Sequence, residues 1–132
     1  MTRNAKEHAI IEALYAQLIG AERIPFPEAR KQLCAPKEKG VYIIFGPNDK
    51  VLHVGMTHSA KDGLRQRLRN HLTAHSSFVK RYYSGNARKL RRGHTFLYLI
   101  VTTLRQRVLL EALATGKLCP ADIGFVGDDA RS

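Results

Sequence analysis

The segment from Lys39 to His71 constrains the fold of this chain more than any other part of the sequence. Its first residues, 40–45 (GVYIIF), form a β-branched and aromatic run that is typical of a strand. Residues 46–49 (GPND) all favour a turn, and residues 51–55 (VLHVG) have the composition of a second strand. The segment is therefore predicted to begin with a β-hairpin.

A basic helix is predicted to follow the hairpin. Leucines recur at helical spacing at positions 64, 68 and 72, and three arginines stand between them: Arg65, Arg67 and Arg69. A hairpin that delivers polar side chains next to such cations is suited to holding a phosphate group.

The N-terminal region is predicted to contain a long helix followed by a turn. Residues 4–19 show an amphipathic pattern, with Asn4 as the N-cap. Residues 24–27 (IPFP) are expected to turn, and Pro27 is expected to open a short helix. We expect this region, 1–38, to be a helical extension packed on the core, because so few residues bury little surface by themselves.

The C-terminal half is predicted to contain one strand and one helix. Residues 95–102 (TFLYLIVT) are nearly all apolar, which favours a central strand covered on both faces. Residues 104–115 then show a helical pattern that Gly116 can end. The order of elements predicts one small α+β domain, with a core at 39–120 and a loosely ordered tail at 121–132.

Length and composition exclude several classes of protein. The chain has 132 residues, which by length is one domain with a modest core. No apolar run approaches the roughly 20 residues that span a bilayer, and the N-terminus does not resemble a secretory signal. The two cysteines, Cys34 and Cys119, fit neither a zinc site nor a disulfide framework, so we expect reduced thiols. These features predict a soluble, cytoplasmic protein that does not bind membranes.

The net charge of +11 is concentrated in one segment. Between Lys61 and Arg107 there are twelve Lys and Arg residues and a single acid, Asp62, which accounts for the whole excess. Such a concentration favours a face that binds a polyanion. A solvated surface is the alternative, and a membrane surface is a weaker one, because no basic helix carries large apolar anchors.

Residues 76–93 form a basic segment with aromatic side chains among the cations. Its aromatic residues could stack on bases. Alternatively, Phe78 and Tyr82 could lie on the inner face of a short helix, which leaves only the cations exposed. In both cases the cations are expected to face nucleic acid. The expected nucleic-acid-binding residues are Gly55, Arg65, Arg69, Lys80, Arg81, Arg88, Lys89, Arg91 and Arg92.

The region from Gly40 to Pro120 resembles the GIY-YIG nucleases. Residues 40–42 (GVY) match the first signature triplet with Val for Ile, and residues 53–55 (HVG) stand at the second triplet with His for Tyr. Arg67 and His71 match the Arg-x-x-x-His of the following helix, and Glu111 lies where the family places its metal-binding carboxylate. The resemblance implies a small three-stranded antiparallel sheet flanked by helices, with Mg²⁺ or Mn²⁺ as cofactor and DNA as partner.

Each role in phosphodiester hydrolysis has a candidate residue. Tyr42 or His53 would activate water: a phenol needs nearby cations to favour its charged form, whereas an imidazole titrates near neutral pH. Tyr42 could instead be a core residue, and His53 could bind the phosphate or lie at the surface. Arg67 is expected to stabilise charge, and His71, one turn later, to position the phosphate or shuttle a proton. Gly55 is expected to let backbone or substrate approach closely.

Glu111 is the candidate metal ligand. It interrupts the apolar run 108–113, where a carboxylate is costly unless it is paired or binds a metal. Mg²⁺ and Mn²⁺ prefer such oxygen ligands. An ion pair with Arg107, one turn earlier, is the alternative. Asp122 is a further candidate, because GIY-YIG nucleases often carry an asparagine after this helix. The remaining histidines, His58, His75 and His94, show no spacing that indicates a site.

The sequence therefore predicts a metal-dependent endonuclease that hydrolyses DNA phosphodiester bonds. RNA remains open as a substrate, and both a monomer and a homodimer are compatible with the sequence. The alternative is a non-catalytic nucleic-acid-binding module on the same fold, favoured by His53 and by the unmatched asparagine. A basic protein–protein adaptor is a third and weaker hypothesis.

Overall fold

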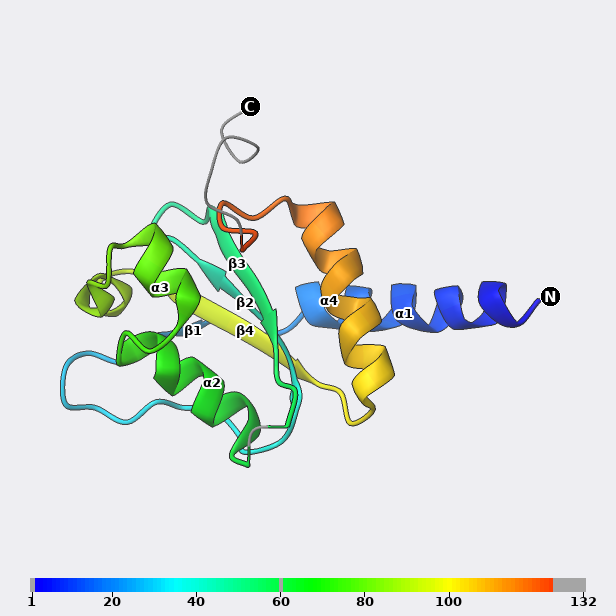
Figure 1. The fold of residues 1–132 in the computed structure, drawn as a ribbon, viewed down its shortest axis with the longest axis horizontal. Coiled ribbons are helices and arrows are strands. Elements are labelled where there is room, and N and C mark those ends of the chain that lie inside the picture. The colour runs from blue at the N-terminus through cyan, green and yellow to red at the C-terminus, as the bar shows by residue number, and fades with distance from the viewer. Residues whose placement is uncertain (1, 60, 125–132) are drawn as a thin grey trace.

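The fold is an α+β arrangement built on an antiparallel sheet (Figure 1). The structure is a computed structural model that describes residues 2–59 and 61–124. Its elements, in chain order, are α1 (Arg3–Ile19), β1 (Ile24–Pro25), β2 (Gly40–Phe45), β3 (Val51–Met56), α2 (Gly63–Leu72), α3 (Ser77–Tyr82), the 3₁₀ helix η1 (Ala87–Arg91), β4 (Thr95–Ile100) and α4 (Leu104–Leu118).

The sheet has four strands in the order β1-β4-β2-β3, not the three that the family resemblance implies. The fourth strand, β1, pairs with β4 through Ile24↔Phe96 and Pro25↔Thr95. The prediction of a turn here was therefore wrong. A short edge strand tolerates proline because its missing N–H leaves no ladder bond unmade within the sheet. The short helix expected after Pro27 is absent from the described structure, where residues 26–39 form turns and irregular backbone.

The two faces of the sheet are covered by different helices. Along β2, Val41 and Ile43 pack against α1 and α4, whereas Tyr42 and Ile44 pack against α2 and α3. This alternation follows from the period of two in a strand. Figure 1 shows α2 and α3 on one side of the sheet and α1 and α4 on the other. Because helices cover both of its faces, β2 is almost entirely buried. The strand order gives β4 the central position that we expected, between β1 and β2, and β2 is internal as well.

The hairpin and the basic helix agree with the sequence predictions. β2 pairs with β3 in a register that sets Tyr42 opposite Gly55, with an irregularity next to Phe45. The start of α2 is fixed by residues 36–38, since the amides of Leu64 and Arg65 donate to the carbonyls of Glu38 and Pro36. Gly63 is required at this junction: its φ is +50°, and a Cβ there would lie 2.2 Å from the Glu38 carbonyl oxygen.

The ends of the two long helices differ from the predictions. Helix α1 begins one residue before Asn4, and Thr2 caps it by accepting a hydrogen bond from the Ala5 amide. Helix α4 continues through Gly116 to Leu118, and Cys119 ends it in a left-handed conformation with φ 47°. No side chain or backbone crowds Gly116, so nothing forces the helix to stop there. Within residues 2–59 and 61–124, no helix is long and apolar enough to cross a membrane.

Candidate active site

Tyr42, His71 and Ser76 form a buried chain of hydrogen bonds beneath the open end of the hairpin. Tyr42 Oη lies 2.7 Å from His71 Nε2, and His71 Nδ1 lies 2.7 Å from Ser76 Oγ. Ser76 also caps α3 by accepting from the Val79 amide at 3.2 Å. All three hydrogen-bonding side chains are buried. A neutral imidazole satisfies both neighbours in either tautomer, because each hydroxyl can donate or accept.

Gly55 makes room for the hydroxyl of Tyr42. The two residues face each other across β2 and β3, and a Cβ on Gly55 would lie 2.3 Å from Tyr42 Oη. The expected close approach at Gly55 therefore exists, but what approaches is the phenol of the same chain. Gly55 is buried and also lines the cleft described below.

Burial keeps both Tyr42 and His71 uncharged. It raises the pKa of Tyr42 to about 12, although Arg67 acts in the opposite direction. A cation next to Tyr42 does favour the phenolate, as expected, but burial outweighs the effect of Arg67. Burial also holds the pKa of His71 well below its usual range, assisted by repulsion from His53 and Arg67. At neutral pH the pair consists of a phenol and a neutral imidazole.

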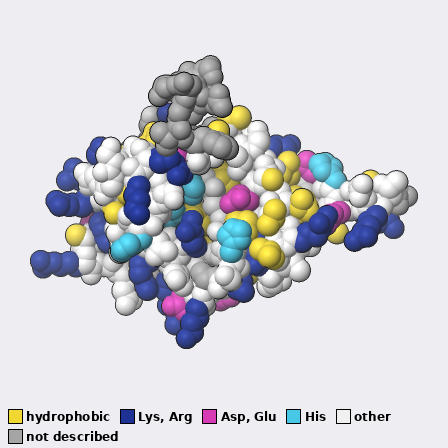
Figure 2. Space-filling model, in the orientation of Figure 1, with side chains coloured by type: hydrophobic (Ala, Val, Ile, Leu, Met, Phe, Trp, Pro, Cys, Tyr) yellow, Lys and Arg dark blue, Asp and Glu magenta, His cyan; other side chains and the backbone are white. Residues whose placement is uncertain are grey.

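An open cleft of about 310 Å³ lies next to this buried chain. Three candidate residues that are far apart in the sequence meet in its lining: His53 from β3, Arg67 from α2 and Glu111 from α4. Gly55 and His58 also line it. On the face drawn in Figure 2, an acidic side chain lies close to histidines and to a basic side chain near the middle of the molecule. Tyr42 and His71 lie behind this lining rather than in it.

Glu111 is a half-buried carboxylate without an ion-pair partner among the described residues. Burial raises its pKa, while His58 and Arg67 act to lower it. The alternative ion pair with Arg107 does not form, because Arg107 is bound elsewhere. Within the described ranges, no group of three or more His, Cys, Asp or Glu side chains could together hold a metal. Among the described residues that line the cleft, Glu111 is the one carboxylate, and carboxylate oxygens are ligands that Mg²⁺ and Mn²⁺ prefer.

His53 is enclosed by its neighbours and does not lie at the surface. Its ring stacks on Phe78 with centroids 4.8 Å apart, and its side chain is only 14 % exposed. Nδ1 lies 3.3 Å from an Asp122 carboxylate oxygen. Asp122 in turn receives two hydrogen bonds from Arg81, at 2.9 and 3.0 Å. Burial alone would raise the pKa of Asp122, but His53 and Arg81 outweigh it and hold the pKa at about 2.

Three buried polar atoms at the cleft lack a hydrogen-bond partner in the described structure. They are Nδ1 and Nε2 of His53 and Nε of Arg67, and of these Nδ1 has an ionic contact at 3.3 Å with the Asp122 carboxylate. Buried polar groups are nearly always paired, so each exception requires an explanation. The other two, Nε2 of His53 and Nε of Arg67, lie on side chains that line the cleft, and an anion with several acceptor oxygens is a ligand that would satisfy both.

The other basic residues fall into three groups. Arg65, Arg69 and Arg91 line a separate pocket. Arg81 is paired with Asp122, and Arg107 is buried, so neither is a free contact for a polyanion. Arg107 donates to the carbonyls of Thr57, His58, Val101 and Thr102. The remaining predicted contacts are exposed: Lys80, Arg88, Lys89 and Arg92. Figure 2 shows Lys and Arg gathered over the half of this face that carries α2 and α3.

The aromatic side chains of residues 76–93 follow the helical alternative. Phe78 is buried on the inner side of α3, and Tyr82 is partly exposed but stacks on Phe78 with centroids 5.8 Å apart. Tyr83 packs against His94. The cations of this segment, not its aromatic rings, form most of its surface.

Sequence reasoning missed His58 in the cleft and Ser76 behind it, and it named Asp122 only as a further metal-ligand candidate. His58 was set aside for lack of spacing, and Ser76 was not considered as a partner of His71. Asp122 was assigned to the tail, yet its amide and that of Ala121 bond to the carbonyls of Leu52 and Val51 on β3. No local signal marks the positions of His58 and Asp122, because their neighbours at the cleft are distant in sequence, whereas His71 and Ser76 are only five residues apart. The rest of the predicted tail, 125–132, lies outside the described residues.

Compared with models of known protein families, the sequence matches none, and a search of curated proteins likewise found no match.

Proposed function

We propose that this protein is a metal-dependent endonuclease that hydrolyses phosphodiester bonds in DNA. The observation that carries the proposal is the convergence of His53, Arg67 and Glu111 on one cleft, where Nε2 of His53 and Nε of Arg67 have no hydrogen-bond partner in the described structure. The similarity of residues 40–42, 53–55, 67 and 71 to the GIY-YIG signature supports the same activity.

In this proposal the cleft binds the scissile phosphate between Arg67 and Glu111. The planar guanidinium of Arg67 matches two phosphate oxygens, and its unpartnered Nε gains an acceptor when the phosphate binds. As negative charge grows on the phosphoryl oxygens, a fixed cation stabilises the transition state more than the ground state. Glu111 is the residue that would hold Mg²⁺ or Mn²⁺, and a bound metal would supply charge stabilisation for the attacking or leaving oxygen.

His53 is the better candidate for the proton acceptor. Its side chain lines the cleft, whereas the phenol of Tyr42 is buried and has a pKa of about 12. Asp122 behind Nδ1 can orient the ring and stabilise the imidazolium that forms when Nε2 takes a proton from water. This role requires a small rotation of the His53 ring, since both ring nitrogens are covered. Tyr42 and His71 then fix the wall behind the phosphate through their hydrogen bond.

A second candidate function is nucleic-acid binding without cleavage. The covered nitrogens of His53 and the raised pKa of Tyr42 favour it, because each leaves the water-activating step without a ready base. Both candidates predict salt-dependent binding, so only turnover separates them.

The test is incubation of supercoiled plasmid with the purified protein in Mg²⁺, in Mn²⁺ and in EDTA. Glu111→Gln keeps the side-chain shape and removes the charge; the exposed Glu22→Gln is the matched control. We expect metal-dependent nicking by the wild type and by Glu22→Gln, and a loss of about a hundredfold or more in Glu111→Gln. Equal cleavage by both variants would remove Glu111 from the site. Tight binding without any cleavage of plasmid, branched DNA or RNA would establish the binding module instead.

A further inference from the structure

A second basic pocket lies on the other flank of α2 from the cleft. Arg67 and His71 project from one flank, and Arg65 and Arg69 project from the opposite one, since residues two apart on a helix point in nearly opposite directions. The pocket has a volume of about 270 Å³. Besides the two arginines of α2, its lining contains Lys31, Gln32, Leu33, Leu72, Thr73 and Arg91. Among the described residues that line it, none is acidic.

The chain holds two of the three guanidinium groups in place without neutralising them. Arg65 Nε donates to the carbonyl of Ala35 at 2.8 Å. Arg91 Nη1 donates to the carbonyls of Pro27 and Glu28 at 2.9 and 3.1 Å. Main-chain carbonyls carry no net charge, so each arginine stays cationic, keeps free N–H groups and has a fixed orientation. Such an arrangement is preorganised for an anion.

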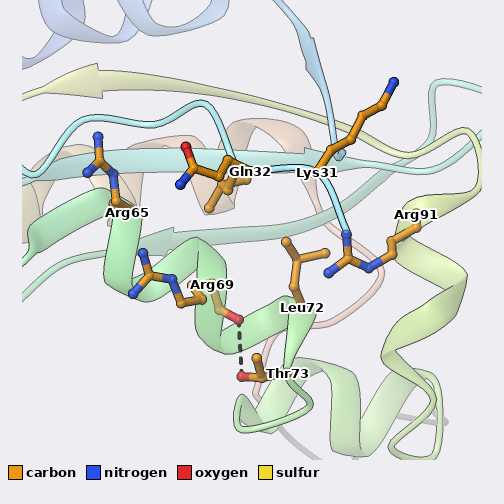
Figure 3. A pocket seen from close by; sticks show the side chains of 8 residues that line it. Lys31, Gln32, Arg65, Arg69, Leu72, Thr73 and Arg91 are labelled. Carbon is orange, nitrogen blue, oxygen red and sulfur yellow. Dashed lines mark hydrogen bonds between the residues drawn. The ribbon is translucent and has the colours of Figure 1, made fainter. Parts of the chain in front are cut away.

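Figure 3 shows how the groups surround the pocket. Arg65 and Arg69 extend from successive turns of α2 on one side, and Arg91 enters from the other side, with Leu72 between them. The amide of Gln32 lies across from Arg69, whereas the Lys31 side chain points away and pairs with Glu28 at 3.6 Å. The guanidinium of Arg69 makes no hydrogen bond or ion pair in the part of the chain that the structure describes.

We propose that this pocket binds a second phosphate group of the nucleic acid, distinct from the phosphate in the cleft. Three like charges around a small polar pocket repel one another until an anion joins them, and the planar fork of arginine matches phosphate oxygens. The inference rests on the proposed nucleic-acid substrate, but it does not require cleavage.

The spacing of the two sites favours the backbone of a duplex. With its side chains, a helix is about 10–12 Å across, which is close to the 12 Å width of the DNA major groove. A duplex lying over α2 would therefore bring phosphates to both flanks of the helix at once. Arg67 would contact one of them, and Arg65, Arg69 and Arg91 would contact another.

The first experiment measures binding of a fluorescent DNA duplex in EDTA at several salt concentrations. Arg69→Ala is the main variant, because Arg69 is exposed and its side chain has no structural bond to lose. Lys6→Ala removes one exposed charge on α1, away from the pocket, and is the matched control. We expect Arg69→Ala to reduce the slope of log K against log salt by about one, and Lys6→Ala to change it much less. Arg69→Lys keeps the charge but loses the planar guanidinium, so we expect it to recover part of the slope that Arg69→Ala loses.

Equal slopes for Arg69→Ala, Lys6→Ala and the wild type would overturn the proposal. A second arm compares duplexes with and without a 5′-phosphate, and titrates the protein with inorganic phosphate. Equal binding of the two duplexes supports a backbone phosphate. An Arg69-dependent gain in affinity from the 5′-phosphate, or Arg69-dependent binding of inorganic phosphate without any effect of Arg69→Ala on the salt slope of DNA binding, would overturn the assignment to the duplex backbone. Cleavage is scored separately. If the wild type never cuts DNA but Arg69→Ala still lowers the salt slope, the proposed nuclease activity is wrong and the proposed phosphate site stands.

Discussion

Gly55 and Tyr42 show how one missing Cβ positions a hydroxyl. Since a Cβ at Gly55 would lie 2.3 Å from Tyr42 Oη, we expect Gly55→Ala to destabilise the fold by about 2 kcal/mol and to displace the Tyr42 ring. Gly116→Ala is the control, because it meets nothing within 4 Å in α4 and should stabilise by about 0.5–1 kcal/mol. Chemical denaturation measures both changes. If Gly55→Ala leaves the free energy of unfolding unchanged, the hairpin can shift at this position without cost.

Asp122 links His53 and Arg81 to the strand β3, and its charge stabilises that link. Its pKa of about 2 lies below the ordinary value near 3.9, so the folded state gains stability above pH 4 and loses it as the pH falls towards 2. We expect Asp122→Asn to cost about 2 kcal/mol at neutral pH, because its side chain is only 5 % exposed. The difference from wild type should shrink between pH 4 and 2. A constant difference over that range would mean that packing, not charge, accounts for the loss.

Predictability at this scale depends on how far apart the interacting residues lie in the sequence. The four-residue spacing of Arg67 and His71 sets both on one flank of a helix, and the structure has them there. Arg107 was counted among the cations of a binding face, yet its partners are carbonyls 5 to 50 residues away. Asp122 likewise meets Arg81 across 41 positions. The local sequence does not distinguish a buried arginine that bonds main-chain carbonyls from an arginine that is exposed to solvent.

At the scale of elements, Arg107 joins α4 to the ends of β3 and β4. Its guanidinium donates to carbonyls of Thr57 and Val101, so one side chain fixes the ends of two strands, and the end of β3 borders the cleft. We expect Arg107→Met to destabilise the protein by about 3 kcal/mol, because it leaves buried carbonyls without donors. Arg105→Met is the control: that side chain is 70 % exposed and pairs with Glu7, so the loss should be below about 1 kcal/mol.

The measurement is urea denaturation of both variants beside the wild type. Arg107→Lys adds a test of geometry, because one ammonium cannot reach carbonyls on two strands at once, and most of the loss should remain. Equal stabilities of Arg107→Met and Arg105→Met would show that water satisfies these carbonyls and that the Arg107 guanidinium does not fix the ends of β3 and β4.

The elements with strong local patterns were predictable, and the others were not. The hairpin, the basic helix and β4 each follow from residue type and periodicity within a dozen positions. Strand β1 could not be found, since two residues that include a proline carry no strand signal and exist as a strand only because β4 offers an edge. The end of α4 was misplaced because glycine permits a helix stop but does not require one.

At the scale of the whole molecule, charge and burial divide the protein into two halves. The helices α2, α3 and η1 together carry eight Lys and Arg residues and no acid, yet the face that α2 turns to the sheet contains His71, a titratable group kept neutral. The predicted concentration of charge thus holds for the solvent-exposed surface of these helices. On the side that packs against the sheet, burial favours uncharged side chains. Stability should therefore respond to pH through the interior, while binding responds to salt through the exterior.

His71 provides the test of that division. Because its pKa in the folded state lies well below the ordinary value near 6.5, the unfolded chain binds a proton first as the pH falls. Stability is therefore complete above pH 7 and declines below about 6.5, by up to about 1.4 kcal/mol per pH unit from this one group. We expect His71→Asn to be less stable than wild type at pH 7.5 but to lose less of its remaining stability between pH 7 and 5.

His8→Asn, which removes an exposed imidazole on α1, should keep the wild-type slope of stability against pH. Urea denaturation at half-unit steps of pH measures all three proteins. A His71→Asn slope equal to that of the wild type would show that the acid sensitivity arises elsewhere, and that the Tyr42–His71 pair tolerates a proton.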